Sequence, residues 1–490
     1  MSVESLLSAA REAQTAWARR LVRQRLEVAR ALRTYVAART EEVVEAIRAA
    51  REGRPAEILS SELLPWLDGV WFLEQNAEQL LAPRKVSPAG RPPWMGTIEL
   101  EVLREPHGVV LVIGPSNYPF FLPGIQSIQA LMAGNAVLLK PGIGGTRAAR
   151  FLARALKAAG LDEHLFNVLE EDPENARQAM RLGVDKVVLT GSVATGRAVL
   201  EQAADSLTPV SLELSGQDAV LVAPTADMRR VARALAFGIR LNQGRTCVAP
   251  RRVFVPRTRL EALESLLTRA LADDRPVPLG NDLRELLDTA HSRGARLITG
   301  SLGEQVMGPL VLSSCPTELA SSPAAVFAPI LWIIPVQDEA EAVRLVRESH
   351  YGLGAAVFGP QEWARRIAEE LPVGVVTLND LIVPTADPRL AFGGRGWSGY
   401  GLTRGPEGFL EMTVPKAILT RGPGPLYHLE EPSPGDYKLL RGYLRAAHGG
   451  GWKERALGAF EFLRSLIGER IRRKSPLNPY RNQTYGLPDE

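Results

Sequence analysis

The chain has 490 residues, 45% hydrophobic and 23% charged, so it is long enough for roughly three folded units and too apolar for wholesale disorder. Its formal net charge of +3 is too small to indicate nucleic-acid binding. Two cysteines, Cys247 and Cys315, exclude a disulfide framework and suit a reducing compartment. Charged residues interrupt the apolar positions of residues 1–20, so we expect no secretory signal and predict a cytoplasmic protein.

The N-terminal part of the chain has helical periodicity. Within residues 5–50, one apolar stripe consists of Leu26, Ala29, Leu32 and Val36. Gly53 and Pro55 end this stretch, and a second helix is predicted over residues 61–81, before Pro83. Both stretches therefore precede any strand.

From Pro106 onward, short apolar strands alternate with helices. Residues 109–113, 136–139 and 187–189 are rich in Val and Leu, which indicates buried strands. Residues 146–159 predict a helix with Thr146 as its N-cap and Gly160 just past its end. This alternation predicts a doubly wound parallel sheet with helices on both faces.

A second alternating α/β stretch covers residues 219–401. Two further predicted strands, 97–103 and 413–420, belong to neither sheet. After residue 420 come Gly- and Pro-rich linkers and then basic helices, one of which has an apolar stripe of Leu457, Phe460, Leu463, Ile467 and Ile471. We expect this stripe to dock on protein, with contact to a membrane surface as the disfavoured alternative.

Three residues in turns after apolar runs form a candidate site for covalent catalysis. Cys247 is the candidate nucleophile, Glu213 the candidate base and Asn117 the candidate oxyanion donor. A thiolate attacks an aldehyde better than a thiol does, so we expect the loop around Cys247 to lower its pKa. Gly244 would allow close backbone approach just before it.

The same residues lie in motifs that resemble the NAD(P)-dependent aldehyde dehydrogenase superfamily, and the resemblance covers nearly everything up to residue 420. Residues 246–250 look closest to the class 3 branch. The motifs follow one another in the family's order: Pro115-Ser116-Asn117-Tyr118-Pro119, Gly134–Pro141, Leu189-Thr190-Gly191-Ser192, Leu212-Glu213-Leu214-Ser215-Gly216, Asn242–Cys247, Tyr351–Phe358 and Phe392–Gly399.

The resemblance implies oxidation of an aldehyde to a carboxylic acid, with NAD or NADP, through a thioester on Cys247. It implies two doubly wound α/β domains, namely a variant Rossmann cofactor domain (1–96 and 106–212) and a catalytic domain (213–405). Oligomerisation strands (97–105 and 406–420) would build a homodimer or homotetramer, and residues 421–490 form a C-terminal extension. The residues implied to bind the cofactor are Lys140, Gly191, Ser192, Gly196, Pro115, Ser116, Leu214 and Phe327.

The cofactor motifs depart from common patterns. A glycine fingerprint at 142–147 fails because Arg147 stands at its third glycine. The family's acid shortly after the ribose-binding lysine is missing, because Ile143 and Gly144 occupy that stretch, so we expect NADP to be tolerated beside NAD. Ala325 replaces the carboxylate that would anchor the nicotinamide ribose.

Two other functions stay open. One is an acylating enzyme that transfers the thioester to coenzyme A, and the other is a degenerate scaffold without turnover. No metal site is expected, since no histidine has ligand spacing. Arg251 and Arg252 are expected to be a solvated pair, and an aromatic substrate approach is suggested by Tyr118, Phe120 and Trp397.

Overall fold

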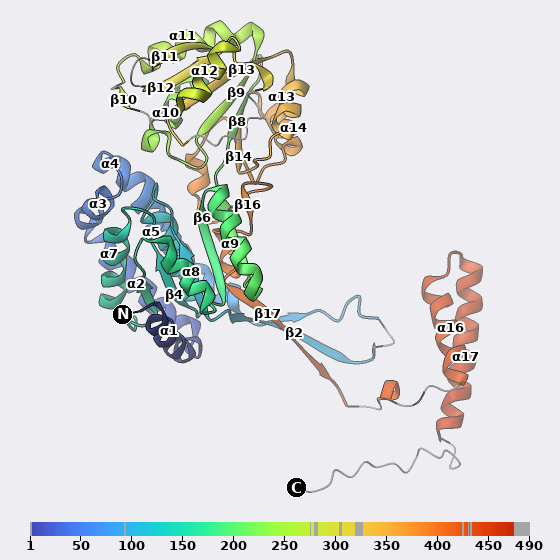
Figure 1. Cartoon of the computed structure of the whole chain (residues 1–490). Coiled ribbons are helices and arrows are strands. Elements are labelled where there is room, and N and C mark those ends of the chain that lie inside the picture. Colours follow the sequence, from blue (N-terminus) through green and yellow to red (C-terminus); the bar gives the residue numbers. More distant parts are fainter. Residues whose placement is uncertain are drawn as a thin grey trace. The chain divides into compact units, whose positions relative to one another are not determined.

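The structure is a computed structural model that describes residues 2–474 except 93–94, 275, 279–282, 303–305, 319–326, 424–425, 430 and 432–433. The chain divides into two compact units (Figure 1). Unit 1 contains residues 1–87 and 100–419, and unit 2 contains residues 88–99 and 420–490. The boundaries predicted inside unit 1, at residues 212 and 405, stay predictions.

Unit 1 begins with helices, most of which pack against the helices of the first sheet. The predicted stripe of Leu26, Ala29, Leu32 and Val36 is buried, which confirms that helix. The second predicted helix starts later than residue 61, because the π-helical turn Leu59–Leu63 precedes it. The helices are α1 (Val3–Ala18), α2 (Val22–Ala37), α3 (Thr40–Arg48), α4 (Pro55–Ile58) and α5 (Leu64–Leu81).

The first sheet is doubly wound, as predicted. Its strand order is β16-β7-β6-β3-β4-β5, and every pair is parallel except β16 with β7. The strands are β3 (Val109–Ile113), β4 (Ala136–Lys140), β5 (Phe166–Val168), β6 (Lys186–Gly191), β7 (Val210–Leu214) and β16 (Gly399–Tyr400). The helices connecting or following them are α6 (Phe121–Met132), α7 (Thr146–Ala158), α8 (Pro173–Arg181), α9 (Val193–Ser206) and α15 (Gly405–Leu410).

The start of α7 differs from the sequence prediction. Thr146 is the first helical residue and Gly145 is the N-cap, so the prediction of Thr146 as N-cap was wrong. The hydroxyl of Thr146 donates to Glu171 instead of accepting from its own helix. Glu171 caps the helix from the loop after β5. The residues next to Thr146 in the sequence therefore do not indicate which group caps the helix. Gly160 has φ +89° just past the helix end, as expected.

The second sheet has order β10-β12-β13-β9-β8-β14-β15, with β11 paired to β12. Its alternating side chains build two cores, one against α10 and α11 and the other against α12, α13 and α14. The strands are β8 (Asp218–Val222), β9 (Pro250–Pro256), β10 (Val277–Pro278), β11 (Arg296–Leu302), β12 (Val306–Ser313), β13 (Ile330–Val336), β14 (Gly354–Phe358) and β15 (Val375–Leu378). The helices are α10 (Met228–Arg240), α11 (Leu260–Leu271), α12 (Arg284–Ser292), α13 (Glu339–Arg347) and α14 (Gln361–Glu370).

A three-stranded sheet contains the two strands that were predicted to lie outside both α/β stretches. Its order is β1 (Arg84–Val86), β2 (Ile98–Pro106) and β17 (Thr413–Arg421). Strand β17 is an edge strand, and every residue in it after Thr413 is exposed. An exposed edge strand offers unpaired backbone groups to another chain.

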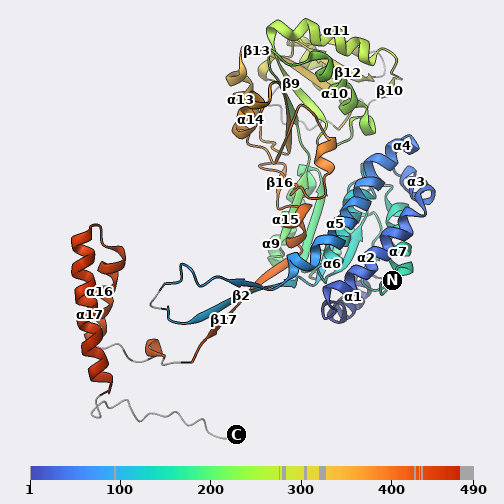
Figure 2. The same ribbon diagram turned by 180° about the vertical axis from the view of Figure 1, so that it is seen from behind.

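Unit 2 contains a helical hairpin. Helices α16 (Pro434–His448) and α17 (Trp452–Lys474) lie side by side in both views (Figure 2). Four residues of the predicted stripe are between 56% and 67% exposed, namely Leu457, Phe460, Leu463 and Ile467. Ile471 lies outside the described side chains. Among the described residues, no helix combines the length and apolarity needed to cross a bilayer.

Candidate active site

The loop before Cys247 is a run of left-handed backbone. Asn242, Gln243 and Gly244 have φ values of +49°, +53° and +69°. A Cβ at Gly244 would lie 2.7 Å from the carbonyl oxygen of Ala328, so this position requires glycine, as the sequence analysis expected. Such backbone persists only where surrounding contacts fix it.

Those contacts come from the loop after β3. Asn242 Nδ2 donates to the Asn117 carbonyl at 2.9 Å, and Asn117 Nδ2 donates to the Arg245 carbonyl at 2.8 Å. The Tyr118 and Thr246 hydroxyls are hydrogen-bonded at 2.6 Å. The structure therefore brings the predicted oxyanion donor beside the predicted nucleophile loop, with its amide bonded two residues before Cys247.

Glu213 lies on β7, where β16 pairs with it. Gly399 stands opposite Glu213 in the ladder, and a Cβ at Gly399 would lie 2.1 Å from the Leu212 carbonyl oxygen. This close pairing places Thr403 so that its hydroxyl donates to Glu213 Oε2 at 2.7 Å. In the described part of the chain, Glu213 Oε1 is buried and has no hydrogen-bond partner.

Arg404 is a buried cation that the sequence analysis missed. Its Nη1 donates to the Thr385 carbonyl at 2.6 Å, and its guanidinium lies 4.1 Å from the centre of the Phe392 ring. Burial raises the pKa of Glu213, whereas Arg404 and the Thr403 hydroxyl lower it. Arg404 lies shortly after the motif that ends at Gly399, but only the β7–β16 pairing shows which groups it faces.

Cys247 and Glu213 line one cavity with a volume of about 810 Å³. Its wall is mainly apolar and also includes Tyr118 and Arg404. Among the described residues, Asn117, Phe120 and Trp397 do not belong to this wall. The apolar side chains that dominate the wall include Leu64, Pro65, Phe121, Leu122, Phe237, Val248, Val383 and Phe392.

The aromatic approach predicted from sequence is therefore only partly right. Tyr118 lines the cavity, but Phe120 is a core residue whose ring lies 5.1 Å from that of Trp66. Trp397 stacks on His350 at 4.3 Å.

The Cys247 thiol has a raised pKa, contrary to the expectation that its loop would lower it. Burial is the main cause, followed by the negative charges of Glu213 and Asp218. Arg404 and a backbone hydrogen bond with Val248 act in the opposite direction but do not outweigh them. The expectation failed because two buried acids face the thiol, and only one of them was recognised in the sequence.

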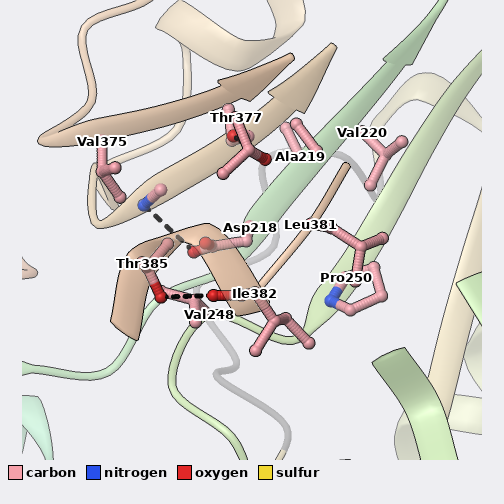
Figure 3. A pocket seen from close by; sticks show the side chains of 13 residues that line it. Asp218, Ala219, Val220, Val248, Pro250, Val375, Thr377, Leu381, Ile382 and Thr385 are labelled. Atoms are coloured by element: carbon pink, nitrogen blue, oxygen red, sulfur yellow. Dashed lines mark hydrogen bonds between the residues drawn. The ribbon is translucent and has the colours of Figure 1, made fainter. Parts of the chain in front are cut away.

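The second acid, Asp218, lies at the start of β8 beside a small pocket of about 10 Å³ (Figure 3). Its Oδ1 accepts from the Gly354 amide at 3.2 Å. Burial raises the pKa of Asp218 to about 7, while Gly354 and the nearby Arg252 and Arg251 lower it. Three residues, Val248, Ile382 and Thr385, line both this pocket and the larger cavity.

Arg251 and Arg252 are buried, so the prediction of a solvated pair was wrong. Arg251 donates to the carbonyl oxygens of Ala328, at 2.6 Å, and Gly244. Arg252 donates from Nε and Nη2 to the Gln217 carbonyl at 2.9 and 2.7 Å. Arg251 thus binds backbone within the nucleophile loop and at Ala328, and Arg252 binds backbone at Gln217, which explains why both side chains are buried.

All the residues predicted to bind the cofactor except Phe327 lie at or just after the carboxyl ends of strands in the first sheet. Buried Lys140 ends β4, and exposed Ser192 is the N-cap of α9, accepting from Thr195 N at 3.2 Å. A Cβ at Gly196 would lie 2.7 Å from Leu214 Cδ1, so the first turn of α9 packs directly on the end of β7.

The other predicted cofactor residues differ in exposure. Ser116 is exposed and Pro115 is half-buried in the loop after β3, while Gly191 ends β6. Phe327 is 39% exposed, and Arg251 lies 5.9 Å from its ring centre. Ala325 lies outside the described residues.

A family model described as "Aldehyde dehydrogenase family" matches residues 1–418. The chain is also 30% identical to 4,4'-diapolycopene aldehyde oxidase from Methylomonas sp, over 85% of this chain and 81% of that protein. This chain belongs to the aldehyde dehydrogenase family.

Solved structures confirm the predicted α/β fold of this family member. One is a Mycobacterium tuberculosis aldehyde dehydrogenase complexed with NAD+, with a TM-score of 0.78 and 24% identity, over 86% of this chain and 91% of that chain. Another is succinic semialdehyde dehydrogenase from Streptococcus pyogenes in complex with NADP+, with a TM-score of 0.77 and 22% identity, over 84% and 94% of the two chains.

Proposed function

We propose that this family member oxidises an aldehyde to a carboxylic acid, with NAD or NADP as hydride acceptor, through a thioester on Cys247. One observation carries the proposal: Cys247 and Glu213 line the same largely apolar cavity. A nucleophile and a base in one cavity can act in turn on one carbonyl carbon. Membership of the family and the dinucleotides named in its solved structures support the same reaction.

In the first half of the reaction, Cys247 loses its proton and its sulfur forms a bond to the aldehyde carbon. Glu213 is the base in reach of the cavity, and its buried carboxylate is more basic than an ordinary one. The oxygen of the adduct becomes negative. Asn117 Nδ2 carries two protons, and its bond to Arg245 uses one, so the second is available for this oxygen.

The hydride that leaves the adduct needs an acceptor, and the nicotinamide ring of a bound dinucleotide would supply this chemistry. The residues fit such a ligand: Lys140 and the exposed N-terminus of α9 lie at the carboxyl ends of a doubly wound sheet, where dinucleotides bind. We assign Lys140 to the adenosine ribose. The other assigned residues are Gly191, Ser192, Gly196, Pro115, Ser116, Leu214 and Phe327.

In the second half, water releases the acyl group from Cys247. Glu213 first releases the proton it took from Cys247 to solvent. It then takes a proton from the water, whose oxygen bonds to the thioester carbon while the carbon–sulfur bond breaks, and the Cys247 thiolate that leaves takes this proton back. The Thr403 hydrogen bond favours the ionised form of Glu213 that this step requires. A carboxylate base of this kind supports water as the acceptor over coenzyme A, whose thiol needs less activation.

The cavity also supports an apolar substrate. Its volume of about 810 Å³ and its lining by Phe121, Phe237, Val383 and Phe392 suit a bulky or long-chain aldehyde without charge. Arg240, which also lines it, is engaged in an ion pair with Asp274 at 2.6 Å.

The test is NAD(P)H formation from a panel of alkyl and aryl aldehydes, with and without coenzyme A. We expect turnover without coenzyme A, a carboxylic acid as product, and a higher kcat/KM for large apolar aldehydes than for acetaldehyde. Strict dependence on coenzyme A would support the acylating alternative. Failure with every aldehyde, in protein whose Cys247 thiol titrates as free, would support the scaffold alternative.

We also propose a homodimer or homotetramer that pairs through β17. The exposed edge of this strand supports the proposal. The molar mass in solution, measured by light scattering, checks it, and replacement of Lys416 by proline on the exposed part of β17 should reduce the assembly to monomers. A monomeric wild-type chain would contradict it.

A further inference from the structure

A carboxylate stands at the N-terminus of α7, in the cofactor half of the molecule. Glu171 Oε2 accepts from the Gly144 amide at 2.8 Å, and its Oε1 accepts from the Thr146 amide at 3.0 Å and from the Thr146 hydroxyl at 2.6 Å. The loop after β4 therefore gives its anion-binding groups to a side chain from the loop after β5. The dipole of α7 favours negative charge at this end as well.

This carboxylate faces Lys140. Burial lowers the pKa of Lys140, and the negative charges of Glu171 and then Asp172 act to raise it. For Glu171 itself, burial acts to raise the pKa, but the hydrogen bonds from Thr146 and Gly144 and the charge of Lys140 outweigh it. The net effect is a lowered pKa, so Glu171 is ionised at neutral pH.

The position matters because of the fold. In doubly wound sheets, the side chains at the carboxyl end of the second strand meet the adenosine ribose, and here that strand is β4, which ends at Lys140. An acid there can bind the ribose 2′-hydroxyl of NAD, whereas the 2′-phosphate of NADP needs a cation and free anion-binding groups. Ile143 is 79% exposed on the loop after β4, and its apolar side chain supplies neither an acid nor a cation.

We propose that Glu171 is a specificity-determining residue that makes this chain prefer NAD over NADP. Its carboxylate occupies the amide and hydroxyl donors that a 2′-phosphate would need, and its charge lies beside the lysine that would neutralise that phosphate. The proposal rests on the proposed cofactor site at Lys140. The sequence analysis expected NADP to be tolerated beside NAD because the acid at 143–144 is missing, and the proposal adds a preference between the two, set by an acid from another loop.

The test measures binding rather than turnover. Dissociation constants of NAD+ and NADP+ are determined by calorimetry for the wild-type chain and for Glu171→Gln. The wild type should bind NADP+ at least tenfold more weakly than NAD+. Glu171→Gln should narrow this ratio by about tenfold, which corresponds to about 1.4 kcal/mol of differential binding free energy.

Glu170→Gln is the matched control. Glu170 is the neighbouring exposed acid, paired with Arg150 at 3.0 Å, so its replacement removes the same charge without touching the α7 amides. This variant should keep the wild-type ratio. The ratio compares two ligands on the same protein. If part of the Glu171→Gln variant is unfolded, the ratio therefore stays the same.

Three outcomes overturn the proposal. Equal affinities in the wild type, or an unchanged ratio in Glu171→Gln, overturn the role of Glu171 and leave the proposed function intact. If neither NAD+ nor NADP+ binds to the wild type, both the role of Glu171 and the cofactor site on which it rests are overturned.

Discussion

The Thr403 hydroxyl donates to Glu213 Oε2 at 2.7 Å across the pairing of β7 with the segment that follows β16. This bond joins two parts of the sequence 190 positions apart, and it stabilises the ionised form of a buried base. The cavity beside it brings Cys247, Glu213 and Arg404 together.

Removing this hydrogen bond should leave a smaller fraction of Glu213 ionised at neutral pH. In Thr403→Val, the pKa of Glu213 should rise further, because a bond that lowers it is lost, and the acidic limb of the pH–rate profile should move to higher pH. Hydrogen bonds to charged groups contribute about 1.5–3 kcal/mol, so kcat at neutral pH should fall about 10- to 100-fold. Thr403→Ser, which keeps the hydroxyl, should stay close to wild type; an unshifted limb in Thr403→Val would contradict this role.

Arg404 should control the reactivity of the thiol. Because Arg404 lowers the pKa of Cys247, Arg404→Met should raise it and slow alkylation by iodoacetamide about tenfold or more at neutral pH. Arg404→Lys keeps the positive charge, so its alkylation rate should lie between those of the wild type and Arg404→Met. The alkylation rate is followed from pH 6 to 10 on Cys247 by peptide mass spectrometry. Equal alkylation rates for the wild type and Arg404→Met would show that Arg404 does not control the reactivity of Cys247.

Asp218 should make stability depend on pH. Its folded-state pKa of about 7 lies above its unfolded value, so unfolding releases a proton between about pH 4 and 7. Stability should therefore fall as pH rises through this window, with a slope of up to about 1.4 kcal/mol per pH unit. Asp218→Asn should lack this part of the slope when thermal unfolding is compared at pH 5 and 7. The same pH dependence in both proteins would show that Asp218 does not titrate in this way.

Gly244 should tolerate no side chain. Its φ of +69° alone costs an alanine about 1–2 kcal/mol, and the added Cβ would also lie 2.7 Å from Ala328 O. Gly244→Ala should lower the thermal midpoint and abolish turnover. Gly160→Ala is the control, since Gly160 has φ +89° with nothing within 4 Å of the added Cβ, so it isolates the backbone cost. Equal effects of the two substitutions would show that the contact with Ala328 is unimportant.

Much of the fold could be predicted from sequence, because buried parallel strands are continuous apolar runs. The strands around 109–113, 136–139 and 187–189 are examples. The motifs also pointed to Glu213 and Cys247, which line one cavity, and to Asn117, whose amide donates to the loop before Cys247. These signals are local in the sequence. A thiol, a carboxylate and an amide can each be recognised as candidate catalytic groups from the residue type alone.

The residues that sequence reasoning misjudged act through distant partners. Thr146 is not an N-cap because Glu171 arrives from the loop after β5, and Arg251 is buried because the Ala328 and Gly244 carbonyls accept from it. Arg404 and Asp218 have no motif signal of their own. Both residues influence the pKa of Cys247 only because the fold places them near it. The local sequence pattern therefore could not predict their role.

The most direct test of the central claim is mass spectrometry of protein quenched in acid during turnover with an apolar aldehyde and dinucleotide. We expect an acyl adduct on the peptide that contains Cys247. Once formed, this adduct should decay more slowly in Glu213→Gln than in the wild type, because its hydrolysis is blocked. Buried Cys315 serves as the internal control and should stay unmodified. Turnover without any adduct on Cys247 in Glu213→Gln, or undiminished oxidation by Cys247→Ser, would contradict the account.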